Sequence, residues 1–377
     1  MGKLRLTVFD KIILFIAINL AVGLILGSVA GKYDPREHIY LAFFGLAYPF
    51  LLLLNFILAV WWCIRGKWTL VVITFAIIGL GWKPLFATFG FFGDEGKGPK
   101  TSEHYVRLMT YNVHQFKPYG SENDESTKNK IMEIVKEENP DVICFQEYYT
   151  RYKGAFDTTD SIKKSLNMRY FYFVPSRQNN YEAYGLAIFS RYPIKNKGNI
   201  LFDQTYRGNE SIYVDLEIEK QRLRVYNVHF QSISFEKQDY QYLDMVTKEM
   251  NTEIGSSKRI ASMIKAAFLK RSQQVDLMKA HIQTCTIPYV IAGDFNDTPA
   301  SYAVMQMTKS LNNAFTKQGS GLGKTYNGKF PNFQIDYIAT TKEIEVVNYH
   351  ITRAKLSDHF PVRSDLRLNY TLETDSL

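Results

Sequence analysis

Two polar residues that follow an apolar run, Asp294 and Asn296, are the first candidates for a chemical centre in this chain. The run from Tyr289 to Ala292 predicts a buried strand, and Gly293 allows a sharp turn at its end. Because side chains alternate along an extended chain, Asp294 and Asn296 point to the same side. A carboxylate that takes a proton, next to an amide that donates a hydrogen bond, suits the activation of water beside an anionic oxygen. An Asx-rich turn after a core strand is the alternative interpretation.

Two further predicted strands end in side chains of the same kind. Asn112 ends an alternating run that begins at Val106, and Glu147 ends the apolar run that follows Asp141. A glutamate at the end of a buried strand is costly unless it is paired or bound to a cation. Glu147 is therefore a candidate cation ligand, and a solvated glutamate at a strand end is the competing interpretation.

A histidine with a neighbouring amide ends another predicted strand. Residues 222–230 alternate and are expected to pair with 211–219 as an antiparallel hairpin, with Asn227 and His229 on one face of its exit. A lone histidine is more often a satisfied core or surface group than a catalyst. The amide donor beside His229 favours a role in contact with an anionic group.

Close to the C-terminus, Asp358 and His359 are adjacent in a predicted exposed turn, where neighbouring side chains face different ways. One of them can therefore bind a metal while the other reaches a substrate. Asp336, at a separate strand, is a candidate to accept the imidazole N–H and fix the tautomer of the histidine.

These residue types together suggest metal-assisted hydrolysis of a phosphate ester. Two carboxylates and an amide suit a hard, oxygen-preferring cation such as Mg²⁺, with Mn²⁺ as a possible substitute. Under this hypothesis the metal polarises a phosphoryl oxygen and Asp294 activates the attacking water. The histidines stabilise the charged transition state.

The first hundred residues contain three apolar segments long enough to cross a membrane, at 9–30, 39–64 and 68 to about 92. Lys83 followed by Pro84 makes the third segment the weakest. Basic residues precede the first segment and separate the second from the third: Lys3, Arg5, Lys11, Arg65 and Lys67. The positive-inside rule then predicts a multi-pass cell-membrane protein whose remaining chain lies on the outer face, periplasmic or extracellular. A buried core hairpin and a cleavable signal peptide are the alternatives.

The net charge of +8 belongs largely to this anchor. Residues 1–100 carry ten Lys+Arg and five Asp+Glu, which leaves 35 minus 32, or +3, for the other 277 residues. A domain with so small an excess lacks the strong basic footprint of most nucleic-acid-binding proteins. Three cysteines lie in apolar runs at unrelated spacings, which favours buried side chains over a disulfide framework.

We expect a membrane anchor at 1–92, a polar, glycine-rich linker at 93–104 and a soluble domain at 105–370. Helices are expected at 128–138 and at 235–284. The part at 235–257 is longer than a strand connection needs, and a lid or a lipid-facing flap is one hypothesis for it.

The motifs of the soluble domain, in their order and spacing, resemble those of the endonuclease/exonuclease/phosphatase superfamily, which includes DNase I and neutral sphingomyelinases. The resemblance covers roughly residues 106–368. It rests on TYNVH at 110–114, FQE at 145–147, YGLAIFSR at 184–191, NVHF at 227–230, GDFN at 293–296, IDYI at 335–338 and SDHFPV at 357–362. It implies a four-layer, DNase I-like α/β sandwich with two central, mostly antiparallel sheets, preceded here by transmembrane helices.

The resemblance also implies roles for individual residues. It implies a metal on Asn112, Glu147 and Asp358. It implies phosphate contacts from Asn227, His229, Asn296 and His359. The catalytic residues it implies are His229, Asp294, Asn296, Asp336 and His359, with Asp336 paired to His359.

The function predicted from these features is that of a monomeric, membrane-anchored, Mg²⁺-dependent phosphodiesterase. Its partners would be the membrane and a phosphodiester substrate, either a lipid or a nucleic acid. An exported nuclease acting on DNA or RNA and a phosphomonoesterase are alternatives. A receptor that binds phosphorylated ligands without turnover, and a structural membrane protein, are hypotheses from other classes.

Overall fold

A computed structural model of the chain describes residues 6–117, 124–204, 207–233, 238–239, 241–242, 245, 254–328 and 333–369. The chain divides into two compact units. The helical unit comprises Met1–Phe89 and Asp297–Met307, and the sandwich unit comprises Gly90–Asn296 and Thr308–Leu377.

The helical unit contains two helices that are long and apolar enough to cross a membrane, spanning Val8–Lys32 and Ile39–Ile64 with 25 and 26 residues. Its elements are α1 (Val8–Val29), η1 (Ala30–Lys32), α2 (Ile39–Ile64), α3 (Trp68–Leu80) and α4 (Trp82–Thr88). The last two helices are bent by 79° at their junction. The break lies four residues before Pro84, whose ring would clash with the carbonyl of residue 80 in a continuous helix. The third span expected from the sequence is therefore not one straight helix but the two helices α3 and α4, with a bend between them.

A segment from the C-terminal half of the chain, Asp297–Met307, belongs to the helical unit. Ala300 is 1% exposed, in an apolar cluster that also contains Leu24, Tyr48 and Ile78. The Thr298 hydroxyl donates to the carbonyl of Gly45 over 3.4 Å. This segment begins directly after Asn296, so one peptide bond separates a predicted site residue from the helical unit. The sequence-based division at 92 and 104 does not anticipate this return of the chain.

Gly45 offers a test of this packing. A Cβ added at Gly45 would lie 2.9 Å from the Cβ of Ala30 and 3.3 Å from the carbonyl oxygen of Ala300. We expect Gly45→Ala to destabilise the helical unit by about 1–3 kcal/mol, as overpacked cores do. Gly79→Ala is the control, because nothing lies within 4 Å of a Cβ there. Thermal melting in detergent, with hydrogen exchange of the amides of 297–307, measures the effect, and equal behaviour of the two variants would contradict it.

The sandwich unit contains two mixed sheets. Among the described residues the first sheet has seven strands, in the order β13 (Ile344–Val346), β15 (Val362–Leu368), β2 (Val106–Asn112), β3 (Val142–Arg151), β5 (Glu182–Ser190) and β4 (Tyr170–Gln178), with β14 (His350–Ile351) beside β15. The second has six, in the order β10 (Asn312–Asn313), β12 (Asp336–Thr340), β9 (Tyr289–Asp294), β8 (Gln221–His229), β7 (Glu210–Ile218) and β6 (Ile194–Leu201). Only β2 with β3 and β8 with β9 are parallel among these pairs. The expected pair of mostly antiparallel sheets is confirmed.

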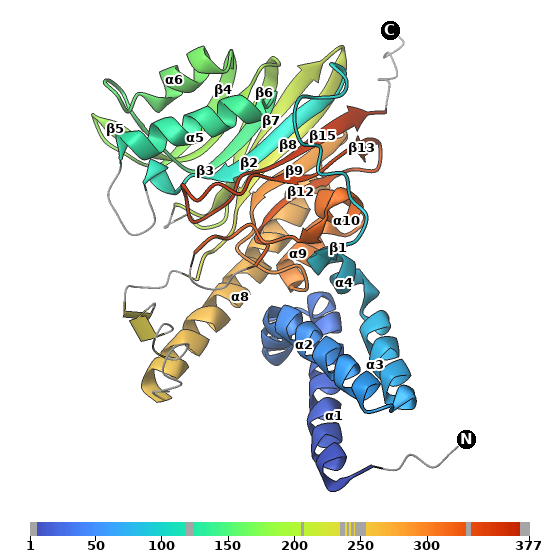
Figure 1. The fold of residues 1–377 in the computed structure, drawn as a ribbon. Helices are drawn as coiled ribbons and strands as arrows, with labels where there is room; N and C mark the ends of the chain where they lie inside the picture. Colours follow the sequence, from blue (N-terminus) through green and yellow to red (C-terminus); the bar gives the residue numbers. More distant parts are fainter. Residues whose placement is uncertain are drawn as a thin grey trace. The chain divides into compact units, whose positions relative to one another are not determined.

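Helices on the outer faces complete the four layers (Figure 1). The described helices of this unit are α5 (Glu125–Glu138), α6 (Thr158–Ser165), α8 (Ile254–Ile282) and α10 (Ala314–Gln318), and α9 (Tyr302–Thr308) begins within the helical unit. Alternate residues of β2 pack in two different hydrophobic clusters. Val106 and Leu108 pack between the sheets. Met109 and Tyr111 of the same strand pack in the cluster that holds Ile131 of α5. Side chains alternate between the two faces of a strand, and both faces of β2 are buried.

Local signals explain where the elements end. The Asp124 side chain accepts hydrogen bonds from the backbone of Ser126 and Thr127 and so caps α5, while Asn139 ends that helix in a left-handed conformation. The hairpin of β7 and β8 turns at Glu219 and Lys220, which both have positive φ, as the two-residue turn that suits a twisted hairpin requires.

The segment expected as a linker, 93–104, lies against the sandwich. The Tyr349 amide donates to the carbonyl of Asp94 over 3.0 Å, and the Arg363 guanidinium donates to that of Gly96 over 2.7 Å. Lys100 pairs with Asp141 at 2.8 Å. The segment is therefore part of the sandwich unit. The region expected as a lid, 235–257, lies mostly outside the described residues, and its role stays a prediction.

Candidate active site

Strand register brings three predicted site residues to one edge of the second sheet. Asp294 ends β9 and lies level with Asp336, the first residue of the antiparallel strand β12. On the other side, the parallel strand β8 ends with His229 level with Asp294. The motifs around these residues are far apart in the sequence, and strand pairing alone makes them neighbours.

Asp294 is the centre of the arrangement and is 1% exposed. Its Oδ2 accepts hydrogen bonds from the side-chain amides of Asn112 at 3.1 Å and Asn296 at 3.2 Å, and its Oδ1 accepts the backbone N–H of Asn296 at 2.8 Å. The Nε2 atoms of His229 and His359 lie 3.7 and 3.6 Å from the same Oδ2. Asn112 comes from the first sheet, so the site is built from both sheets.

His359 is held by Asp336. Nδ1 of His359 lies 2.9 Å from Oδ2 of Asp336, and its backbone N–H donates to the Ser357 hydroxyl over 3.2 Å. With Nδ1 directed to Asp336, Nε2 is the nitrogen that faces Asp294. The structure thus places Asp336 where the sequence predicts an orienting carboxylate.

The three predicted metal ligands also lie together. Oε2 of Glu147 and Oδ1 of Asp358 lie 3.5 and 3.7 Å from one atom, Nδ1 of His114. The Asn112 amide approaches Oε1 of Glu147 at 3.5 Å, and its oxygen accepts the backbone N–H of His114 at 3.1 Å. His114 was given no role by the sequence patterns, although it lies in the TYNVH motif two residues after Asn112. Its position in that motif is the signal that could have identified it.

Several residues at the site have positive φ, an uncommon conformation for side chains larger than glycine. The φ angles are 44° at His114, 50° at Glu147 and 53° at Asn296. Such strain persists only where the surrounding structure enforces it, and it concentrates at functional sites. The structure around these three residues therefore holds their backbone in this conformation.

Asn227 lies apart from the group around Asp294. It is fully buried, and its amide donates to the carbonyls of Phe145 at 2.9 Å and Ala187 at 3.0 Å in the other sheet. Its oxygen accepts the side-chain amide of Gln146 at 2.6 Å. These bonds give Asn227 a bridging position between the sheets, which does not favour its predicted contact with substrate. Asn296 is half-buried and donates to the carbonyl of Phe230 at 2.9 Å.

Burial and neighbouring charges shift the acidity of the central groups. Burial raises the pKa of Asp294 to about 6, and Asp336 adds to this rise against the opposing effect of His359. Burial by itself lowers the pKa of His359, but Asp336 and Asp294 outweigh it and hold that pKa well above the usual value. Burial would raise the pKa of Glu147, yet the hydrogen bond with His114 and the nearby histidines lower it to about 2. The site thus combines an ionised Glu147, a carboxylate that titrates near neutrality and a charged imidazole.

The pKa shifts of Asp294 and His359 predict how catalysis at this site would depend on pH. Asp294 can accept a proton only when deprotonated, and its pKa is raised to about 6. We therefore expect kcat/KM to rise about tenfold per pH unit below that value and to level off above it. His359 remains protonated past its usual range, so any fall lies on the alkaline side. A pH–rate profile measures this, and a flat profile between about pH 5 and 8 would be inconsistent with Asp294 as the base.

The fold is a two-sheet α/β sandwich whose polar centre lies at the strand ends. A family model described as the Endonuclease/Exonuclease/phosphatase family matches residues 109–359, more than half of the chain. The chain belongs to this family, as its motifs predict. Residues 10–88 match a second family model, described as a domain of unknown function, DUF8431. No curated protein is similar enough in sequence to count as a match.

Several solved structures are similar to this chain. The endonuclease/exonuclease/phosphatase from Bacteroides vulgatus is 18% identical, with a TM-score of 0.51 over 70% of this chain and 99% of that one. The corresponding protein from Beutenbergia cavernae DSM 12333 is 17% identical, with a TM-score of 0.49 over 70% of this chain and 72% of that one. The human Nocturnin catalytic domain with bound sulfate anion is 18% identical, with a TM-score of 0.48 over 70% and 95%. The similarity to the Bacteroides vulgatus structure supports the DNase I-like fold and carries no conclusion about activity.

Proposed function

We propose that this chain is a divalent-metal-dependent phosphodiesterase that its helical unit attaches to a membrane. The observation that carries the proposal is Asp294: a buried carboxylate within 3.7 Å of two imidazoles, one of which is oriented by a second aspartate. This arrangement combines a proton acceptor with two positive or hydrogen-bonding groups, which is what attack of water on a phosphate ester requires.

In the proposed reaction, Asp294 takes a proton from the attacking water, whose oxygen forms a bond to phosphorus. The bond from phosphorus to the leaving oxygen breaks, its electron pair stays on that oxygen, and the oxygen takes a proton from solvent to leave as an alcohol. The Nε2 atoms of His229 and His359 face the same carboxylate oxygen, so both are placed to stabilise negative charge on the phosphoryl group. Asp336 keeps the His359 ring in position and favours its charged form.

Members of the family usually use a divalent metal, and we propose Asn112, Glu147 and Asp358 as the residues that hold it. Their oxygens are hard donors, and the Glu147 and Asp358 carboxylates already converge on one point beside His114. When bound, Mg²⁺ or Mn²⁺ would supply charge that polarises a phosphoryl oxygen and steadies the leaving oxygen. Asp294, Asp336 and His359 form a second group, with potential ligand atoms within 4.8 Å of one another. Because Nδ1 of His359 is engaged by Asp336, we assign that group to proton transfer.

A membrane location is supported by the two helices that are long and apolar enough to span one. We propose that the bent pair of α3 and α4 forms a third span. The basic residues before the first helix and after the second are then cytoplasmic, and the third span leads to a sandwich unit on the outer face. A reporter fused after Leu377 is expected to be active outside the cytoplasm. Cytoplasmic activity of the reporter would refute this orientation.

A substrate panel tests the proposed function. Purified full-length protein with Mg²⁺ or Mn²⁺ is assayed on bis(p-nitrophenyl) phosphate, phospholipid vesicles, DNA, RNA and a phosphomonoester. We expect hydrolysis of a diester that is lost in His359→Ala and retained in His104→Ala, a control at an exposed histidine. Preference for DNA or RNA would favour the nuclease alternative. Ligand binding without turnover of any diester would overturn the proposal in favour of a receptor.

A further inference from the structure

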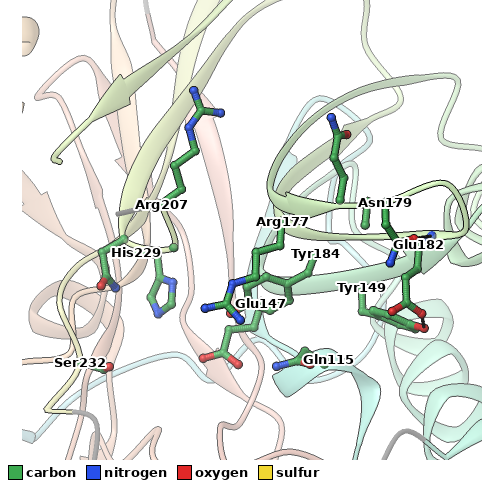
Figure 2. Close-up of a pocket in the computed structure, with 14 residues that line it drawn as sticks. Gln115, Glu147, Tyr149, Arg177, Asn179, Glu182, Tyr184, Arg207, His229 and Ser232 are labelled. Carbon is green, nitrogen blue, oxygen red and sulfur yellow. Dashed lines mark hydrogen bonds between the residues drawn. The ribbon is translucent and has the colours of Figure 1, made fainter. Parts of the chain in front are cut away.

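A cavity of about 430 Å³ lies beside the strand ends, with both Glu147 and His229 in its lining. Figure 2 shows Glu147 on the wall formed by the first sheet and His229 on the wall formed by the second. Of its 14 lining residues, only Ala183 and Gly208 lack a polar side-chain atom. A cavity of this size holds a small ligand, and its polar lining suits a hydrated substituent better than an acyl chain.

Two register shifts meet at this cavity. Both occur where neighbouring strands pair with Gly185 of β5: between Phe145 and Tyr148 in β3, and between Pro175 and Arg177 in β4. Extra residues of this kind re-aim side chains and are common beside active sites. The first shift contains Glu147, and the second comes directly before Arg177. A Cβ at Gly185 would lie 2.1 Å from the carbonyl oxygen of Val174, so the close approach of the strands requires glycine.

The second shift places Arg177 in the lining of the cavity, which also contains Arg207 from outside these strands. Figure 2 shows its side chain extending into the space that Glu147 and His229 also line. Within the described part of the chain, Arg177 forms no ion pair with a carboxylate. Glu182, the other lining carboxylate, instead accepts a hydrogen bond from Tyr149 at 2.5 Å and lies 3.5 Å from Arg151. The guanidinium group thus has no ion-pair partner among the described residues, and it lies in the cavity that Glu147 and His229 line.

We propose that Arg177 binds a second anionic group of the substrate, carried on the substituent next to the scissile phosphate. The preferred substrates would then be phosphate esters of a small polar alcohol that bears a further phosphate or carboxylate. This inference rests on the proposed function, because it takes the Glu147 and His229 end of the cavity as the place of the scissile phosphate. A guanidinium fork matches the geometry of both kinds of anion with two parallel hydrogen bonds.

The test compares ligands that differ by one phosphate. Full-length protein in detergent with Mg²⁺ is titrated by calorimetry with glycerol monophosphate and with glycerol bisphosphate. We expect the wild type to bind the bisphosphate about tenfold more tightly or better, since hydrogen bonds to charged groups contribute at this level. Arg177→Gln should lose this preference and keep its affinity for the monophosphate, which also shows that it is folded. Arg169→Gln, at an exposed arginine just before β4, should behave as the wild type.

A second arm distinguishes a lipid from a soluble ligand. Phosphatidylcholine vesicles that contain phosphatidylglycerol or phosphatidylglycerophosphate present the same one-phosphate difference on a membrane. An Arg177-dependent preference on vesicles alone supports a lipid headgroup, and a preference in both arms supports a subsite that accepts either source. A wild type without preference, or a preference that survives in Arg177→Gln, would overturn the inference. Because binding needs no turnover, an Arg177-dependent preference in a protein that hydrolyses nothing would sustain the subsite while the proposed function fails.

Discussion

Replacement of Asp294 by asparagine is expected to lower kcat by about 1,000-fold, within the range that general base catalysis contributes. Asparagine keeps the size of the side chain and cannot take a proton from water. The pKa of Asp294, raised to about 6, makes the carboxylate an effective proton acceptor near neutral pH. Steady-state kinetics on the best diester of the panel measure the loss, and KM should change little because Asp294 acts on the water.

The matched control for this prediction is Asp160→Asn. Asp160 lies in α6, pairs with Lys164 at the surface, and has no predicted role. A variant Asp294→Asn that retained more than about a tenth of the wild-type kcat would show that another group accepts the proton.

Replacement of Glu147 by glutamine is expected to raise the Mg²⁺ or Mn²⁺ concentration needed for half-maximal activity by about 100-fold or more. Loss even of a hydrogen bond that supports a metal ligand costs about 10- to 100-fold, and removal of a ligand charge costs more. Because the pKa of Glu147 is lowered to about 2, the wild-type carboxylate is ionised at neutral pH. Excess metal should restore part of the activity.

Direct binding of Mn²⁺, followed by electron paramagnetic resonance, separates this effect from catalysis. Glu133→Gln, at an exposed position of α5, should bind as the wild type does. Unchanged Mn²⁺ affinity in Glu147→Gln would contradict the assignment of Glu147 to the metal.

The site residues at the strand ends could be predicted from the sequence because two patterns occur together at each of them. An apolar run such as 289–292 predicts a buried strand, and the polar residues that follow cannot remain in the core without a function or a partner. The family motifs then place His229, Asp294 and Asp336 in one fold. Strand register makes them adjacent in the structure, at the edge where β8, β9 and β12 meet.

The features that sequence patterns missed depend on contacts between distant parts of the chain. No periodicity indicates that Asp297–Met307 joins the helical unit, because its packing depends on Gly45 and on the apolar cluster around Ala300. The bridging position of Asn227 depends on the spacing of the two sheets. The shifts around Gly185 similarly require three strands to be aligned before Arg177 can be placed in the cavity.

The most direct test of a single hydrolytic centre compares kcat/KM for Glu147→Gln, His359→Ala and the double variant on one diester. Residues that act together on one reacting group lose most of their effect at the first substitution, so the double variant should be about as slow as the slower single variant. Effects that multiply would show that the two residues serve separate functions. A wild type without metal-dependent hydrolysis would contradict the enzyme assignment itself.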